Sequence, residues 1–184
     1  MINYELPTSV EVNGKIYEIR SDYRVILDLI DALNDLDLRP REKSLVVLEI
    51  FFKDPGAIPP QDYEAAIKTA FWFIDGGQER KEGNAPDIVD WAKDFPLIVA
   101  PINTIAGGDI RAKEYVHWWT FLAWYGEIPN DCTFAQVLNI RDKNARNKQL
   151  DKTEREWYRR NKELVDRPQR YTSAEEEFLK QLGG

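Results

Sequence analysis

The chain of 184 residues has little of the chemistry that metal sites and catalytic sites use, because it contains one cysteine and one histidine. A single cysteine, Cys132, excludes an intramolecular disulfide framework, and one cysteine with one histidine cannot supply the usual zinc ligands. Nucleophilic catalysis would need Cys132 or a serine beside a base, and His117 is the sole histidine. Cys132 lies in "PNDCTF" without a local motif, so we interpret it as a thiol near a helix cap. We therefore expect no catalytic residue and no metal ligand.

Phosphate-binding loops and membrane segments are also missing. No GxGxxG or Walker-type sequence occurs, and the glycine pairs at 76–77 and 107–108 follow apolar segments as helix stops. The longest apolar stretch, "FPLIVAPI" at 95–102, is less than half of the roughly 20 residues that span a bilayer. The first residues lack the basic and apolar regions of a secretory signal. We expect no cofactor, no membrane contact and an intracellular location.

What the chain does contain is enough apolar surface for a folded core, since 43% of its residues are hydrophobic and 12% are aromatic. Its formal net charge of -7 disfavours a protein that lives on nucleic acid. The hydrophobic periodicity predicts a mainly α protein: one globular domain over residues 1–184, with five to seven helices and a small β-hairpin at 7–20. The hairpin turn is predicted at Asn13-Gly14, a pair suited to the positive φ angles of a type I′ turn.

Turn residues and capping signals give the expected helix boundaries. Residues 167–184 are expected to form a C-terminal helix or tail, with a helix start at Ser173. A helix starting at Pro96 should be kinked or broken by Pro101, and a capping box is expected at Thr133 and Gln136. The other expected helices cover residues 22–36, 40–53, 60–74, 112–126, 134–141 and 152–165.

The stretch "EYVHWWTFLAWYGE" at 114–127 is the most aromatic part of the chain. On a helical wheel of 100° per residue, one broad apolar face predicts core residues at Tyr115, Trp118, Trp119, Leu122 and Tyr125. The opposite face carries His117, Thr120 and Trp124. Tryptophan is over-represented among residues that carry binding energy, so this second face is either another core contact or a partner contact.

Residues 141–170 hold eleven Lys/Arg against six Asp/Glu, with Trp157 and Arg160 close together. This segment is the best nucleic-acid signal of the chain. Glutamates alternate with the bases at helical spacing, however, which is typical of a solvated or protein-contacting helix. A nucleic-acid-binding accessory factor stays open as the alternative function.

The order of several segments resembles the bacteriophage gp-fifteen family of tailed-phage proteins, which are grouped with tail assembly chaperones. The resemblance covers roughly residues 7–166, and its most specific element is His117-Trp118-Trp119 followed by Phe121. One departure is Pro101, which interrupts a helix that reads as continuous in the family. The quoted segments are "NGKIYEIRSDYR", "LEIFFKD", "AAIKTAFWFIDGG", "DWAKDFPLIVAPINTIAGGDIR", "YVHWWTFLAWYGEI", "TFAQVLNIR" and "DKTEREWYRRNKELV".

This resemblance implies a non-enzymatic role in tail assembly in the cytoplasm of the bacterial host. The implied partners are the tape measure protein, the major tail protein that forms the tail tube, and a second tail assembly chaperone, with a homo-oligomer left open. The family brings no catalytic residues. From the wheel and the basic segment, we expect partner contacts at His117, Trp118, Trp119, Thr120, Trp124, Trp157 and Arg160.

Overall fold

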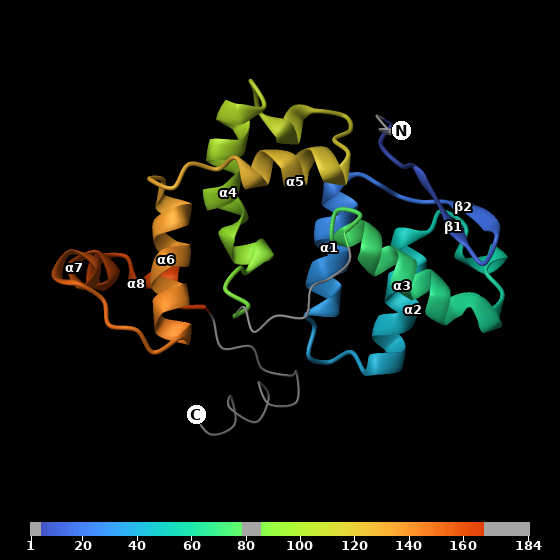
Figure 1. Cartoon of the computed structure of the whole chain (residues 1–184), viewed down its shortest axis with the longest axis horizontal. Helices are drawn as coiled ribbons and strands as arrows, with labels where there is room; N and C mark the ends of the chain where they lie inside the picture. Colours follow the sequence, from blue (N-terminus) through green and yellow to red (C-terminus); the bar gives the residue numbers. More distant parts are fainter. Residues whose placement is uncertain (1–4, 79–85, 168–184) are drawn as a thin grey trace, which may run out of the picture. The chain divides into compact units, whose positions relative to one another are not determined.

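A computed structural model describes residues 5–78 and 86–167 of the chain (Figure 1). Its contacts divide these residues into two compact units, which are described separately below. Unit 1 comprises residues 5–78 together with 117–119, and unit 2 comprises 86–116 together with 120–167. The mainly α class with an N-terminal hairpin is confirmed, with eight α-helices in the described ranges, one more than the upper expectation. One domain over 1–184 stays a prediction.

Unit 1 begins with the predicted hairpin, in which β1 (Ser9–Val12) pairs antiparallel with β2 (Lys15–Glu18). Asn13 and Gly14 have φ angles of 48° and 81°, as a type I′ turn requires. Alternate side chains of the strands enter the core of the unit, so Val10, Val12 and Tyr17 are buried. The predicted hairpin and its turn at Asn13-Gly14 are therefore confirmed.

Three helices complete unit 1: α1 (Tyr23–Leu33), α2 (Pro40–Phe51) and α3 (Tyr63–Ile74). Two short 3₁₀ turns, η1 (Pro55–Ala57) and η2 (Pro60–Asp62), lead into α3. α1 packs on α2, α2 on α3, and α3 on β1 (Figure 1). The Arg20 guanidinium donates to the carbonyls of Glu49, Ile50, Phe52 and Lys53, and so satisfies acceptors that the end of α2 leaves without helical partners.

Unit 2 contains α4 (Trp91–Ile105), η3 (Ile110–Ala112), most of α5 (Trp118–Gly126), α6 (Thr133–Ala145), α7 (Lys152–Arg160) and α8 (Lys162–Val165). α4 packs on α6, and α8 packs on both α6 and α7. Val137, Ile140 and Val165 form the centre of one apolar cluster, against which Leu150, Trp157 and Leu164 pack.

Several expected helix boundaries in this part of the chain were wrong. α4 starts at Trp91, with the Asp90 carboxylate accepting from the Lys93 N–H, and it continues through Pro96 and Pro101. Each proline removes one N–H from the ladder, whereas burial of Ile98, Val99 and Ile102 holds the helix to its neighbours. The expected helix start at Pro96 and the expected break at Pro101 were therefore wrong.

The aromatic helix α5 begins at Trp118 rather than at 112, because residues 113–117 after η3 are not helical. The cap of α6 is Cys132, whose sulfur accepts from the Ala135 N–H at 3.4 Å, rather than Thr133. This agrees with a thiol at a helix cap. The expected helix at 152–165 is interrupted at Asn161, which separates α7 from α8. The helix expected from Ser173 lies outside the described residues.

Candidate partner-binding site

His117 connects two distant segments of unit 1 through both nitrogens of its ring. Nδ1 accepts from the Trp119 N–H at 3.0 Å and so caps the first turn of α5. Nε2 lies 3.0 Å from the Pro7 carbonyl oxygen, to which it can only donate. The two contacts together define the neutral tautomer with its proton on Nε2. His117 is buried, and this desolvation lowers its pKa, although the bond to Pro7 acts in the opposite direction.

Trp118 is also a structural residue, with 1% of its surface exposed. Its backbone N–H donates to the Ser21 carbonyl at 2.8 Å, and its indole Nε1–H donates to the Ile74 carbonyl at 2.8 Å. Ile74 is the last residue of α3, so the indole satisfies one of the acceptors at that helix end. Trp118 therefore helps to fix the beginning of α5 to the end of α3.

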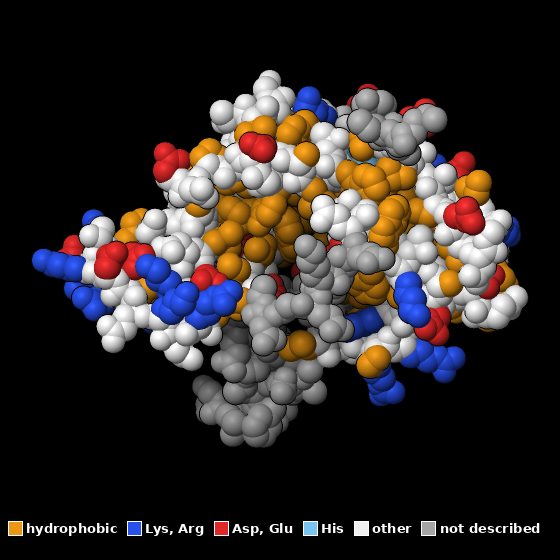
Figure 2. Space-filling view, viewed as in Figure 1, with side chains coloured by type: hydrophobic (Ala, Val, Ile, Leu, Met, Phe, Trp, Pro, Cys, Tyr) orange, Lys and Arg blue, Asp and Glu red, His pale blue; other side chains and the backbone are white. Residues whose placement is uncertain are grey.

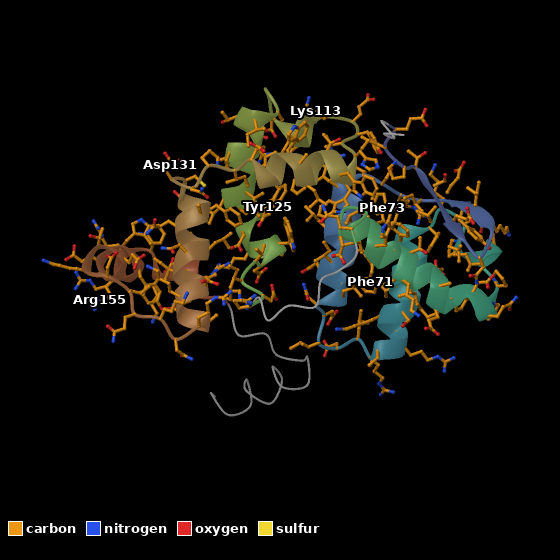
Figure 3. All side chains as sticks on the ribbon, in the orientation of Figure 1. Phe71, Phe73, Lys113, Tyr125, Asp131 and Arg155 are labelled. Atoms are coloured by element: carbon orange, nitrogen blue, oxygen red, sulfur yellow. The ribbon has the colours of Figure 1, made fainter. Side chains whose placement is uncertain are left out.

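Trp119 contacts the same helix end and lies only partly buried. Its indole Nε1–H donates to the Phe73 carbonyl at 2.9 Å, and its ring stacks on the Phe73 ring with centroids 5.5 Å apart. Figure 3 labels Phe73 near this end of α3. Gly77 leaves the space for the indole, because a Cβ there would lie 2.8 Å from Cη2 of Trp119. Its φ of +79° also favours glycine.

Trp72 adds the exposed part of this aromatic cluster. Its ring meets the Trp119 ring edge to face at 5.7 Å, and 39% of its surface is exposed. Glu64, Lys68 and Trp72 follow one another at a spacing of four residues along α3, so the indole lies on the polar face of the helix. We call these two residues the Trp72–Trp119 surface. It presents the exposed indole of Trp72, which packs on the indole of Trp119, and a hydrogen bond to Phe73 holds the Trp119 indole in turn.

The remaining aromatic residues of α5 belong to unit 2. Trp91 packs against Phe121 and Tyr125, with centroids 6.3 Å and 5.0 Å away, and Tyr125 also meets Phe134. Burial and the charge of Asp94 raise the pKa of Tyr125 to about 12, so its phenol stays protonated at neutral pH. This group is therefore suited to packing and hydrogen bonding rather than to proton transfer.

A buried ion pair is the most enclosed polar feature of unit 2. The Arg141 guanidinium donates to both carboxylate oxygens of Asp94, at 2.6 Å and 2.9 Å, with side-chain exposures of 6% and 1%. Its other hydrogens go to main-chain carbonyls, which belong to Ile88, Leu164 and Val165. The Asp94 carboxylate also accepts from the Asp90 N–H. Every group in the pair is satisfied, so it joins α4, α6 and α8 structurally.

The basic segment 141–167 is balanced only in part by acidic side chains. Trp157 and Tyr158 pack against the apolar cluster of α6 and α8 instead of standing free. Arg160 is exposed on α7. Figure 2 shows acidic side chains beside the basic ones over α7. Ion pairs with acidic residues occupy Arg141, Lys143, Arg146, Lys162 and Arg167.

The predicted contact residues fall in both units. His117, Trp118 and Trp119 belong to unit 1, and all the others, Thr120, Trp124, Trp157 and Arg160, belong to unit 2. Burial assigns His117 and Trp118 to the core, and Thr120 and Trp124 are half-buried. Whether these residues bind a partner stays a prediction.

The expected core face of α5 needs one correction. Trp118 and Phe121 are fully buried, whereas Tyr115 is 52% exposed. The wheel assumed a helix that already included residue 115, and the helix starts only at 118. Residue 115 lies outside the helix, so its side chain does not share the helix face of Trp118.

Two residues that matter for the structure were not predicted from the sequence, although the pattern around each of them indicates its role. Trp72 follows Glu64 and Lys68 at the spacing of one helix face, so it is a tryptophan on a charged face. Arg141 follows Phe134 and Val137 at the spacing of the apolar face of α6, so it is a charge on a buried face. Both are residues of the wrong polarity for their position.

Within residues 5–78 and 86–167, no group of three or more His, Cys, Asp or Glu side chains could hold a metal ion. The helices of these ranges are all too short or too polar to cross a membrane.

A comparison with protein families matches residues 2–166 to the family described as Bacteriophage Gp15 protein. Neither the comparison with curated proteins nor the comparison with solved structures found a match.

Proposed function

Because the chain belongs to the bacteriophage Gp15 family, we propose that it is a non-enzymatic tail assembly chaperone or accessory protein. It binds the tape measure protein during tail morphogenesis and keeps this long helical protein soluble while tail-tube subunits are recruited. The major tail protein and a second tail assembly chaperone are its further partners. It acts in the cytoplasm of the infected bacterium.

The observation that best supports a binding role is the exposed indole of Trp72 on the polar face of α3. Burying a large aromatic side chain against a partner releases far more apolar surface from water than most surface contacts do. Trp119 and Gly77 hold the indole from one side, so little side-chain entropy is lost on binding. Rigid tryptophans in such positions are typical hot spots of protein interfaces.

This observation shifts the proposed contact from the predicted residues to their neighbours. Trp119 remains part of the surface, and Trp72 becomes its centre. His117 and Trp118 support it from within, because their hydrogen bonds to Pro7 and Ile74 fix the start of α5. A partner helix or strand with apolar residues at the contact would satisfy such a surface.

The geometry supports the nucleic-acid alternative less well than it supports a protein partner. Phosphate binding needs cations that face solvent without acidic partners, and base stacking needs free aromatic faces. In the segment 141–167 five cations form ion pairs, and five exposed ones, Lys148, Lys152, Arg155, Arg159 and Arg160, form none with a described residue. Its two aromatic residues, Trp157 and Tyr158, pack against the apolar cluster, so neither offers a free face for stacking. Binding of a protein partner is therefore the one function that we propose.

The test is co-expression with the tape measure protein encoded by the same phage. The wild-type chain is expected to raise the soluble fraction of the tape measure protein and to co-purify with it. Trp72→Ala is expected to weaken binding by about thirtyfold, which corresponds to a hot-spot loss of about 2 kcal/mol. Leu45→Ala removes another exposed apolar side chain, on α2, and should bind like the wild type.

Two results would count against the proposal. One is equal solubility of the tape measure protein with and without the chain. The other is equal loss of binding in Trp72→Ala and Leu45→Ala, since this would indicate unspecific hydrophobic contact rather than the Trp72–Trp119 surface.

A further inference from the structure

A groove of about 480 Å³ lies beside Trp72 in unit 1. One wall is β1, through Ser9, Val10 and Glu11, and the other wall is α3, through Lys68, Thr69 and Trp72. Pro7 closes one end. We call this feature the β1 groove. It shares Trp72 with the Trp72–Trp119 surface, so an occupant of the groove would also cover that indole.

The backbone of β1 has an unpaired edge along this groove. The Ile19 N–H donates to the Thr8 carbonyl at 3.0 Å, and Val10 and Val12 stand opposite Tyr17 and Lys15. In an antiparallel pair, the N–H and C=O of one residue point to the same side, and this side alternates along the strand. Thr8, Val10 and Val12 therefore face β2, whereas Ser9 and Glu11 direct their backbone groups away from it.

Among the described residues, the outward backbone groups of Ser9 and Glu11 receive no hydrogen bond from another segment. Such an edge can accept one more strand. Its length is limited at both ends. Pro7 has no N–H, and its carbonyl already accepts from His117, while Asn13 turns into the hairpin with a φ of 48°. Two residues thus offer two donors and two acceptors, which suits a short extended peptide.

The side chains of the groove restrict which peptide fits. Lys68 is held by Glu64 at 2.6 Å, whereas the exposed Glu11 forms no ion pair with a described residue. In an added antiparallel strand, the residue opposite Glu11 would share its solvent face, where a lysine or arginine complements the carboxylate. The next residue, opposite Val10, would face the other way, toward Thr69 and Trp72, and should be apolar.

We infer that the β1 groove binds an extended segment of a partner protein as an additional antiparallel strand beside β1. The segment carries a basic, an apolar and a small polar residue in this order, opposite Glu11, Val10 and Ser9. Main-chain hydrogen bonds supply affinity and the pattern supplies selectivity, as in other cases of strand addition. The inference rests on the proposed function only in assigning this segment to a tail protein.

The structure offers a substitution that removes one edge donor and leaves the hairpin intact. Ser9→Pro deletes an outward N–H, and edge strands tolerate proline where the N–H faces away from the ladder. The carbonyl of the preceding Thr8 accepts from the Ile19 N–H, and a residue before proline prefers extended backbone. Ser9→Ala is the matched control, because it changes the side chain and keeps the N–H. Glu11→Lys reverses the charge without removing a backbone donor.

The probe is a blocked seven-residue peptide with lysine, isoleucine and threonine at its centre, titrated into the full-length chain. Binding is followed by peptide fluorescence polarisation and by hydrogen exchange of the Ser9 and Glu11 amides. We expect binding to the wild type and to Ser9→Ala, with slowed exchange at both amides. Ser9→Pro and Glu11→Lys should each bind at least tenfold more weakly, and so should the peptide with the reversed order.

Three outcomes would overturn the inference: no binding to the wild type, equal binding to Ser9→Pro and Ser9→Ala, or unchanged exchange at both amides. Sedimentation provides a fourth, because a dimer that Ser9→Pro abolishes would make a second copy of the chain the occupant. The peptide titration tests only the groove. If the peptide binds as expected while the tape measure protein gains no solubility on co-expression, the groove stands and the proposed function fails.

Discussion

The two units fix their distant segments with different chemistry. In unit 1, the start of α5 is held by neutral donors, the rings of His117, Trp118 and Trp119, which bind backbone carbonyls of Pro7, Ile74 and Phe73. In unit 2, the corresponding connection is a buried ion pair, Arg141 with Asp94. Both arrangements satisfy every polar group they bury, but they should respond differently to substitution and to pH.

A neutral hydrogen bond contributes about 1 kcal/mol net, and its loss leaves one carbonyl to find water. A buried ion pair adds little stability compared with an apolar pair of the same size. Removal of one partner, however, leaves the other charge buried and unpaired, which is strongly destabilising. We therefore expect single substitutions that remove a charge to reduce the stability of unit 2 most. The stability of unit 1 should depend more on added atoms that crowd its core and on acid near neutral pH.

The largest effect is expected for Arg141→Ala. It leaves the carboxylate of Asp94, 1% exposed, without its countercharge, and should lower the free energy of unfolding by about 3–5 kcal/mol. Urea denaturation measures this loss. Arg146→Ala on the same helix is the control, since its pair with Asp142 is partly exposed and should contribute about 0.5 kcal/mol or less.

A double substitution tests whether the unpaired charge of Asp94 causes this loss of stability. Arg141→Met with Asp94→Leu removes both charges, and should recover part of the stability lost in Arg141→Ala. Recovery will be incomplete because three main-chain carbonyls also lose their donor. A double variant that is less stable than Arg141→Ala would contradict the unpaired charge of Asp94 as the main cause of the loss, since both variants lack the three carbonyl contacts.

The next largest effect is expected in unit 1, for Gly77→Ala. The substitution costs about 1–2 kcal/mol for a side chain at positive φ, and about 1–3 kcal/mol more for crowding against the Trp119 indole, 2.8 Å from the new Cβ. Gly107→Ala is the matched control, with a φ of +69° and open space around its Cβ. Equal losses of stability in the two variants would contradict the close packing of Trp119 on Gly77.

A smaller effect is expected from pH, and it should distinguish the units. The folded protein holds the pKa of His117 below its ordinary value through burial, so the unfolded chain binds more protons as the pH falls below about 6.5. The stability that His117 contributes is complete above this pH and declines as the pH falls toward the folded pKa. Urea midpoints between pH 7.5 and 5 should show this slope.

His117→Asn is the variant that checks the assignment. Asparagine can still cap the helix start, but it does not titrate. Because the chain has no other histidine, the slope in this pH range should become clearly smaller in the variant. An unchanged slope would mean that the ring of His117 is not the neutral acceptor and donor described above.

The smallest effect concerns α7 in unit 2, where Glu154 accepts from Lys143, from the Asp151 N–H and from Asn139. These contacts, the one from Lys143 first, lower its pKa to about 2. Its contribution is therefore complete above pH 4.5 or so and is lost as the pH falls toward 2. Glu154→Gln should reduce the acid slope of stability between pH 4.5 and 2.5, with no change near pH 6.

The sequence predicted those elements well whose boundaries are set by local chemistry. Asn13-Gly14 specified the turn, and the alternating runs on either side of it specified the two strands. Pro40 marked the start of α2 correctly. In each case, the residues that determine the structure are neighbours along the chain.

Elements that depend on distant contacts were predicted less well. Pro101 would break an isolated helix, but burial of its neighbours Ile98 and Ile102 keeps α4 continuous. The ring of His117 caps α5 only because Pro7, 110 residues earlier, orients it. For the candidate site, the sequence identified Trp119, but it missed Trp72, because the contact between these two rings joins α3 to α5.

The most direct test of the central claim is the binding constant between the purified tape measure protein and three forms of the chain: wild type, Trp72→Ala and Leu45→Ala. Isothermal calorimetry at fixed salt gives all three values. We predict that Trp72→Ala binds about thirtyfold more weakly than the other two, while its thermal unfolding stays close to that of Leu45→Ala. Equal binding by all three forms would contradict the account, because the Trp72–Trp119 surface would then take no part in holding a partner.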